Sequence, residues 1–277
     1  MKTVESLKKN TLAKKTNVYF FSDAPKVGDE TKVGMVRSYL TSVSGFLSVN
    51  IVERSDNCRV SNNRGGMEFL LNRYGKVIFM EDDIVTAPGF IRFVNEGLEF
   101  SKNIGSVFAV GGHTPNLYSL RCLSCDNYYS SRFHGWGFGI WKDRYEKISK
   151  IPSWDLIKYD PETVKNLKAM GSDMTAMIRS ESEGRINAFD IRSCYYMAKN
   201  EKYMLLPKMA LVKNIGLDGS GVHCGADDPY DDALWLKEDF NFDEFVFFNK
   251  NIISEYRKFY SLSLQRRIVN RIRKIYV

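Results

Sequence analysis

The 277-residue sequence lacks any run of about 18 uncharged apolar residues, so no transmembrane helix is predicted. Its Lys-rich start also lacks the apolar core that signal peptides carry. These two absences lead us to expect a cytoplasmic protein. No internal repeat or low-complexity linker is seen, and a chain of this length with 44% hydrophobic residues can bury a large core.

Cysteines are few and odd in number, at positions 58, 122, 125, 194 and 224. Their scattered spacing in so long a chain excludes a disulfide-stapled mini-domain and favours reduced thiols. Cys122 and Cys125 form one C-x-x-C pair, but no second pair follows at the spacing of a zinc finger. A structural zinc site is therefore not expected.

Acidic residues are absent from residues 256–277, which hold seven of the 40 Lys and Arg residues. The rest of the chain has 33 basic residues against 33 acidic ones, so the tail carries the net charge of +7. A helical face in the tail is formed by Leu264, Ile268, Ile272 and Ile275. We predict a basic amphipathic helix over 251–277 that lies on an anionic membrane surface rather than on nucleic acid. The alternative is a helix that packs on the domain.

Short apolar runs alternate with helical patterns between residues 17 and 111, which is typical of βαβ units with a parallel sheet. Strands are expected at "NVYFFSD", "LSVNIVER", "KVIFM" and "VFAVGG", of which "KVIFM" looks the most buried. A helix between the first two strands has an apolar face formed by Val33, Val36, Leu40 and Val43. A helix starting near Arg64 and a later one capped by Asp160 are also predicted.

Three consecutive carboxylates, Glu81, Asp82 and Asp83, follow "KVIFM". Ligands of open α/β sheets bind beyond the carboxyl ends of the strands, so this edge is a candidate site. Carboxylates packed together raise one another's pKa values unless a cation offsets the charge, and a divalent metal that bridges them to a diphosphate would do so. The alternative is a solvated acidic run. Asp23 closes another strand at the same edge, either as an acceptor for a base or ribose or as a turn former.

Three segments together resemble a known family: "VIFMEDDIVTAPGFIRFVNEGLEF", "SRFHGWGFGIWKDR" and "NIGLDGSGVHC". They look like nucleotide-sugar-dependent glycosyltransferases of the GT-A fold, similar to bacterial surface-polysaccharide enzymes and N-acetylglucosaminyltransferase I. The resemblance spans about residues 2 to 225. It implies an α/β fold with a Rossmann-like mixed sheet flanked by helices.

The same resemblance implies one GT-A domain over residues 1–250, with the helix of 251–277 after it. Residues 1–112 would form the nucleotide-binding half and residues 113–250 the acceptor half. Family members begin with an apolar strand that ends in an Arg-bearing loop, whereas this sequence starts at the next helix, "KTVESLKKNTLAKKT". We therefore expect the first strand of the fold to be absent.

On the donor side, the resemblance assigns Mn²⁺ (or Mg²⁺) to Asp83. Glu81 and Asp82 would face the sugar and ribose of the donor, and Asp23 the nucleobase and ribose. "VSNNRGG" lies where the family keeps a polar contact to the base, which transfers weakly to Asn62 and Asn63. A Gly-rich loop near the diphosphate is expected to act through backbone N–H groups and the side chains of Asp218, Ser220 and His223, although a purely structural turn explains it equally.

Two aspartates compete as the general base of an inverting reaction. Asp173 falls where the family places its base, at the start of a helix whose N-terminus would keep it ionised, although it could simply be a helix cap. Asp190 is the alternative base. The acceptor sugar is expected at Trp136, Gly137 and Phe138, unless these residues only pack a bent chain, and His134 is expected to hydrogen-bond locally.

The sequence thus predicts a metal-dependent, inverting glycosyltransferase. It would move a sugar from a UDP-linked donor to a hydroxyl of a glycan acceptor in surface-polysaccharide (O-antigen or capsule) synthesis. An acceptor carried on a lipid would place the enzyme on the inner face of the cell membrane. The alternatives are a nucleotidyltransferase, for which no Gly-rich triphosphate loop is seen, and a non-catalytic module that binds a membrane or nucleic acid through its tail.

Overall fold

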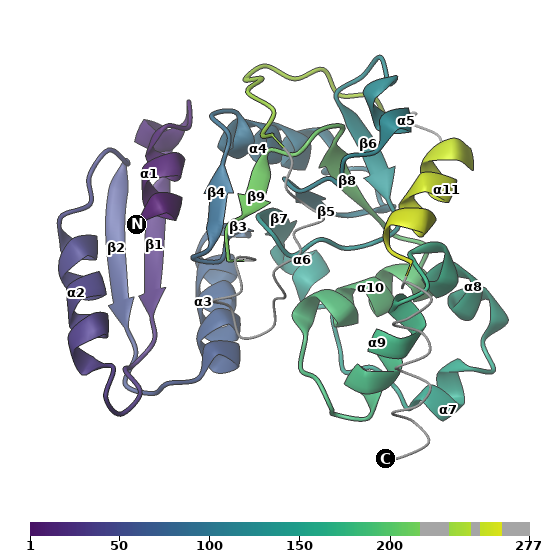
Figure 1. Cartoon of the computed structure of the whole chain (residues 1–277), viewed down its shortest axis with the longest axis horizontal. Coiled ribbons are helices and arrows are strands. Elements are labelled where there is room, and N and C mark those ends of the chain that lie inside the picture. The colour runs from purple at the N-terminus through teal and green to yellow at the C-terminus, as the bar shows by residue number, and fades with distance from the viewer. Residues whose placement is uncertain (217–232, 245–249, 262–277) are drawn as a thin grey trace.

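The computed structural model describes residues 1–216, 233–244 and 250–261 (Figure 1). Asp218, Ser220, His223 and the predicted amphipathic face of the tail lie outside the described residues. The strands are β1 (Asn17–Ser22), β2 (Ser48–Glu53), β3 (Lys76–Phe79), β4 (Ile84–Thr86), β5 (Val107–Gly111), β6 (Asn127–Ser130), β7 (Phe138–Trp141), β8 (Tyr203–Pro207) and β9 (Val212–Asn214).

Helices surround these strands. In chain order they are α1 (Lys2–Lys8), the 3₁₀ helix η1 (Ala13–Lys15), α2 (Glu30–Thr41), α3 (Arg59–Tyr74), α4 (Phe90–Phe100), α5 (Tyr118–Arg121), α6 (Lys142–Tyr145), α7 (Trp154–Ile157), α8 (Pro161–Ala169), α9 (Met174–Ser182), α10 (Phe189–Lys199) and α11 (Lys250–Phe259). Figure 1 shows α1 and α2 with β1 and β2 at one end of the molecule, and α7 to α11 at the other. The fold is mixed α/β, as predicted.

The strands form a mixed open arrangement rather than one parallel sheet. β1 and β2 pair in parallel as a sheet of their own, whereas a five-stranded sheet has the order β3-β7-β5-β8-β6. Within the larger sheet β5 and β8 are parallel, and the other pairs are antiparallel. A short antiparallel pair of β4 and β9 was not predicted, because three-residue strands carry too little periodicity.

Helix α3 joins the two sheets. The ring of Phe69 lies 6.3 Å from that of Tyr19 and 6.5 Å from that of Phe21, both on β1. Met67 and Leu71, on the same helix, belong to the large core beneath the five-stranded sheet. A Cβ on Gly66 would lie 3.1 Å from the Phe21 ring, so glycine permits this close approach of helix and strand.

Three local expectations were wrong. β3 is an edge strand whose residues are half-buried, whereas all five residues of β5 are buried. α3 begins at Arg59 rather than near Arg64, so Asn62 and Asn63 lie on a helix instead of in a loop. The predicted face of α2 buries Leu40, but Val36 remains 54% exposed.

The expected boundary at residue 250 does not coincide with a break in packing. Ile252, Tyr256 and Tyr260 are buried in the same core as α8 to α10. Glu255 accepts hydrogen bonds from the backbone N–H and the hydroxyl of Ser119. Residues 250–260 are therefore part of the domain. No helix of the described residues is long and apolar enough to cross a bilayer.

Candidate functional site

The turn after β1 places Asp23 at the edge of the two-stranded sheet. The backbone N–H of Ala24 donates to the Asp56 carbonyl over 3.3 Å, and the Asn57 amide donates to the Ala24 carbonyl over 2.5 Å. The Asn62 amide donates to the Phe21 carbonyl over 3.2 Å. The loop between β2 and α3, together with the first turn of α3, thus holds the chain on both sides of Asp23.

The N-terminal turn of α3 lies between Asp23 and the acidic turn. The Ser61 hydroxyl lowers the pKa of the exposed Cys58 thiol, and the negative charge of Asp23 acts on it in the opposite direction. The next residue, Arg59, acts on Glu81. Burial raises the pKa of Glu81 overall, and the positive charge of Arg59 opposes that rise. The charge of Asp23 thus acts on Cys58 and that of Arg59 acts on Glu81, both at the N-terminal turn of α3.

The acidic turn, residues 81–83, connects β3 to β4. Burial, followed by the charge of Asp83, raises the pKa of Glu81. Burial, followed by the charge of Asp82, raises the pKa of Asp83. Asp82 is exposed, and its carbonyl accepts a hydrogen bond from the Thr3 hydroxyl of α1. The turn thus collects negative charge that its surroundings only partly offset.

The turn is also tied to the segment after β9. The Ile215 N–H donates to the Asp83 carbonyl over 2.8 Å, and the Gly216 N–H donates to the Asn214 side-chain oxygen over 2.7 Å. A Cβ on Gly216 would lie 2.6 Å from Oδ2 of Asp83, so a side chain there would press on this carboxylate. The described chain therefore passes directly beside Asp83 at the start of the Gly-rich segment.

Asp190, in the first turn of α10, approaches the acidic turn from the other half of the domain. Burial raises the pKa of Asp190, and its charge in turn contributes to the raised pKa of Glu81. An ideal Cβ on Gly135 would lie 3.9 Å from the Asp190 Cβ. The alternative base is therefore a neighbour of both the donor carboxylates and the predicted acceptor segment.

Three predicted donor residues carry buried side-chain oxygens that have no hydrogen-bond partner among the described residues. These atoms are Oδ1 of Asp23, Oδ1 of Asn62 and Oδ1 of Asp83. A buried acceptor without a partner costs about 1–3 kcal/mol, so each such atom calls for an explanation such as a water, an ion or a ligand. Oxygens of this kind accept from N–H or hydroxyl groups, or bind hard divalent cations.

No protein-family model matches this chain, and no curated protein matches it significantly.

Asp83 would suit a divalent ion in an open site that substrate phosphates complete, rather than in a closed site made of protein ligands alone. In the part of the chain that the structure describes, no three His, Cys, Asp or Glu residues are arranged to hold a metal. Asp83 nevertheless offers a buried oxygen without a partner and a raised pKa, both of which a cation would relieve. Magnesium-type ions are commonly held by one or two carboxylates together with substrate phosphates.

Asp173 has a partner that the sequence did not reveal. Its two oxygens accept from Nη1 and Nη2 of Arg132 over 2.9 and 2.8 Å. Arg132 also donates to the Met170 carbonyl over 3.2 Å, and its guanidinium lies 4.1 Å from the ring of Tyr260, the residue after the end of α11. Asp173 occupies the N-cap position of α9 without making a cap hydrogen bond, so its carboxylate serves the ion pair instead.

Arg132 connects the two candidate bases, because its charge also acts on Asp190 and lowers the pKa of that carboxyl against burial. The sequence motif "SRFHGWG" contains this arginine, but nothing in its spacing indicates that it faces Asp173 about 40 residues later. Side chains that meet only through tertiary packing leave no local pattern. Arg59 and Arg132 are the cations of the site that sequence reasoning missed.

The predicted acceptor residues divide into two groups. Phe138 lies in the core with its ring 5.5 Å from that of Phe79, and a Cβ on Gly137 would lie 3.0 Å from the ring of Phe90. Both residues therefore pack the bent chain, and the expectation that they face a sugar was wrong. Trp136 is half-buried, with its ring 4.7 Å from that of His113, and stays a candidate.

His134 hydrogen-bonds locally, as predicted. Its Nδ1 lies 3.3 Å from Nδ1 of His113, and its Nε2 contacts the Tyr256 hydroxyl. Burial lowers the pKa of His113 to about 3 and that of His134 well below its usual value. Both imidazoles are therefore neutral near pH 7, and their contacts link Trp136 to α11.

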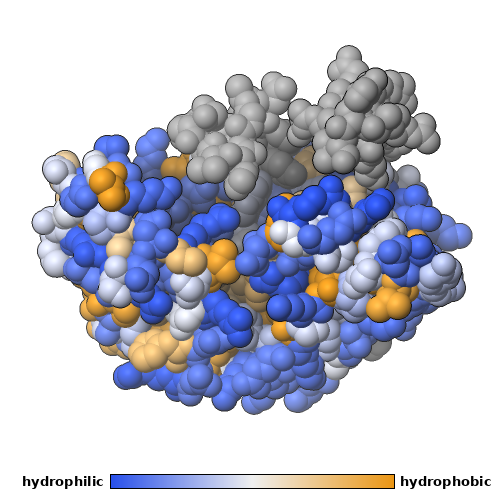
Figure 2. Space-filling model, turned by 90° about the horizontal axis from the view of Figure 1, so that it is seen from below, coloured by the Kyte–Doolittle hydropathy of each residue, from blue (hydrophilic) through white to orange (hydrophobic). Residues whose placement is uncertain are grey.

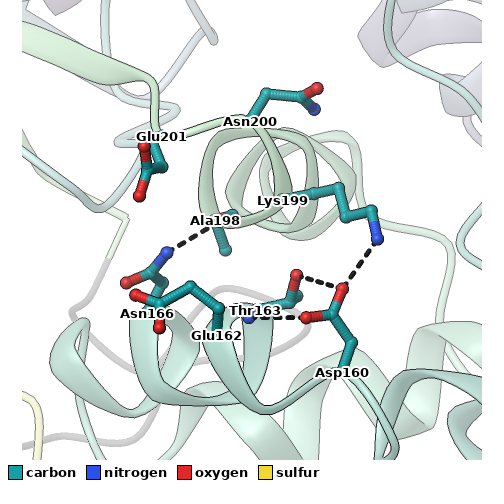
Figure 3. Close-up of a pocket in the computed structure, with 8 residues that line it drawn as sticks. All are labelled: Asp160, Glu162, Thr163, Asn166, Ala198, Lys199, Asn200 and Glu201. Atoms are coloured by element: carbon teal, nitrogen blue, oxygen red, sulfur yellow. Dashed lines mark hydrogen bonds and ion pairs between the residues drawn. The ribbon is translucent and has the colours of Figure 1, made fainter.

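A cavity of about 270 Å³ lies elsewhere, between α8 and α10, and contains none of the predicted site residues (Figure 3). Asp160 and Lys199 in its lining form an ion pair over 2.7 Å, and Asp160 also accepts a hydrogen bond from the Thr163 hydroxyl over 2.8 Å. These contacts, Lys199 first, lower the pKa of Asp160 to about 2.

The surface in Figure 2 is mostly hydrophilic, with apolar residues in small scattered groups. Neither feature competes with the acidic edge as a functional site.

Proposed function

We propose that the protein is a metal-dependent, inverting glycosyltransferase of the GT-A type. It takes a UDP-linked sugar as donor and a glycan hydroxyl as acceptor, in the synthesis of a surface polysaccharide such as O-antigen or capsule. The observation that carries the proposal is the set of three buried oxygens without partners among the described residues, on Asp23 after β1, Asn62 in the first turn of α3 and Asp83 after β3. Such oxygens would suit several classes of nucleotide-binding enzyme, and the resemblance of the motifs favours a glycosyltransferase.

The arrangement supports a division of labour along the edge. Asp23 and Asn62 offer acceptor oxygens to the N–H groups of a base and the hydroxyls of a ribose. Asp83 would hold Mn²⁺ or Mg²⁺, with Glu81 and Asp82 beside the donor sugar. The bound ion would supply Lewis acidity that neutralises charge on the departing diphosphate.

A general base must receive the acceptor's proton as the new bond forms. Asp173 has the family's position in its favour, but both of its oxygens are engaged with Arg132. Asp190 has a raised pKa, and its charge acts on Glu81. A carboxylate with a raised pKa accepts a proton more readily while it is ionised, so both aspartates are kept as candidates.

The proposal is tested by calorimetric titration of UDP into the protein with and without Mn²⁺. UDP is expected to bind only in the presence of the ion, and Asp83→Asn is expected to abolish this binding. Asp239→Asn, an exposed carboxylate paired with Arg92 elsewhere on the surface, is the matched control and should bind UDP as the unaltered protein does. Equal UDP affinity in the Asp83→Asn variant would refute the metal assignment.

A further inference from the structure

Arg37 of α2 lies at the ends of both strands of the two-stranded sheet, with its side chain 22% exposed. Its Nε donates to the Ser22 hydroxyl over 3.2 Å, and its Nη2 donates to the carbonyls of Asp23 and Arg54 over 3.2 and 3.4 Å. Its Nη1 pairs with the Glu53 carboxylate over 2.7 Å. One planar group therefore binds the end of β1 to the end of β2.

These contacts of Arg37 act on Asp23, the residue proposed to bind the nucleoside part of the donor. The carbonyl that Arg37 holds is that of Asp23, whose side-chain Oδ1 is buried without a described partner. The other hydrogen bonds that hold this stretch come from uncharged donors, namely the Ser22 hydroxyl, the Ala24 N–H and the side-chain amides of Asn57 and Asn62. Hydrogen bonds from a charged donor are about twice as strong as neutral ones, and the rigid fork of a guanidinium fixes geometry as well as distance.

We propose that Arg37 is a positioning residue for the nucleoside end of the donor. It holds the Asp23 backbone so that the Asp23 carboxylate presents its buried oxygen to the ligand, beside the oxygen of Asn62. Arg37 does not itself contact the nucleotide, because its three nitrogens are engaged with the strand ends. The inference rests on the proposed function, since it takes a nucleotide as the ligand of this edge.

The test compares two ligands that share the diphosphate end, UDP and inorganic pyrophosphate, each titrated calorimetrically with Mn²⁺. In Arg37→Gln the Kd for UDP should rise about tenfold, while the Kd for pyrophosphate should stay within about twofold. Glu53→Gln is the matched control: it removes one ion pair of Arg37 and leaves the contacts to Ser22 and Asp23. This control should bind both ligands within about twofold of the unaltered protein.

Two results with Arg37→Gln would overturn the inference: an unchanged Kd for UDP, or equal weakening of both ligands, which would indicate a general structural role. Should Arg37→Gln fail to fold, Ser22→Ala removes the Nε contact together with the 3.5 Å hydrogen bond from the Ser22 hydroxyl to the Asp23 carbonyl, and an unchanged Kd for UDP there would also overturn the inference. In Ser22→Ala, a two- to threefold rise in the Kd for UDP but not for pyrophosphate, about the effect of one weak hydrogen bond, would support the inference. Failure of the unaltered protein to bind UDP would instead refute the proposed function.

Discussion

Glu81→Gln should make the ligand-free protein more stable at neutral pH. The substitution keeps the shape of the side chain and removes one negative charge from an edge where burial, Asp83, Asp190 and Asp82 all raise the pKa of Glu81, while Arg59 opposes them. Neutralising such a strained functional position commonly adds about 0.5–2 kcal/mol. We expect about 1 kcal/mol, or ~2–4 °C in Tm for a chain of this size.

The pH dependence gives this prediction its sign. A carboxyl whose pKa is raised by folding binds its proton more tightly in the folded state, so its ionisation lowers stability as the pH rises from the unfolded pKa through the folded one. At pH 4 Glu81 keeps more of its proton in the folded protein, and Glu and Gln should then be nearly equivalent. The advantage of Glu81→Gln should therefore be large at pH 7.5 and small at pH 4.

Thermal unfolding in EDTA, followed by circular dichroism at both pH values, measures this difference. Glu68→Gln serves as the control, because Glu68 lies on the surface of α3 in an ion pair with Arg64 and its loss should cost no more than about 0.5 kcal/mol. A Glu81→Gln variant that is no more stable than the unaltered protein at pH 7.5 would refute the electrostatic account of this edge. An equal gain at pH 4 and pH 7.5 would refute it as well.

Three further predictions concern the two candidate bases and the helix α11. Asp173→Asn should cost about 2 kcal/mol of stability, because it weakens the bidentate pair with the mostly buried Arg132, whereas Asp190→Asn should cost nothing at pH 7.5. In the same two variants, release of UDP from a UDP-sugar should fail only where the base has been removed, with UDP affinity kept; release at the normal rate in both would exclude both aspartates. A chain that ends at residue 249 should lose cooperative unfolding, because burial of Ile252, Tyr256 and Tyr260 contributes about 1.5–3 kcal/mol of stability each. A chain that ends at residue 261 should keep cooperative unfolding. Equal melting temperatures of the two chains would contradict the role given to α11.

Local patterns in the sequence predicted local structure well. The strands at Asn17–Ser22, Ser48–Glu53 and Val107–Gly111 were found from their apolar runs. The cap of α8 was also predicted, and Asp160 accepts a hydrogen bond from the Thr163 N–H. These features depend on neighbouring residues only, so the sequence contains the information directly.

Features that depend on residues far apart in the chain were missed. The start of α3 was placed too late because "VSNNRGG" has two asparagines and two glycines, which favour turns until tertiary packing decides otherwise. The pairing of Arg132 with Asp173 brings the segment before β7 to the start of α9, and the core position of Phe138 depends on ring contacts with Phe133 and with Phe189 of α10. The candidate site was thus predicted where it follows strand ends and was missed where it depends on side chains that meet across the domain.

The separation of β1 and β2 from the five-stranded sheet has a consequence for motion. Backbone hydrogen bonds of strand pairing tie β1 to β2, while the described contacts of β1 with α3 are mainly between side chains. Such a unit can open locally without breaking the pairing of β5, which has strand neighbours on both sides. The end of β1 at Asp23 therefore lies in a two-stranded unit that is joined to the rest of the fold through α3, and a ligand that bound both Asp23 and Asp83 would add a second link between the two sheets.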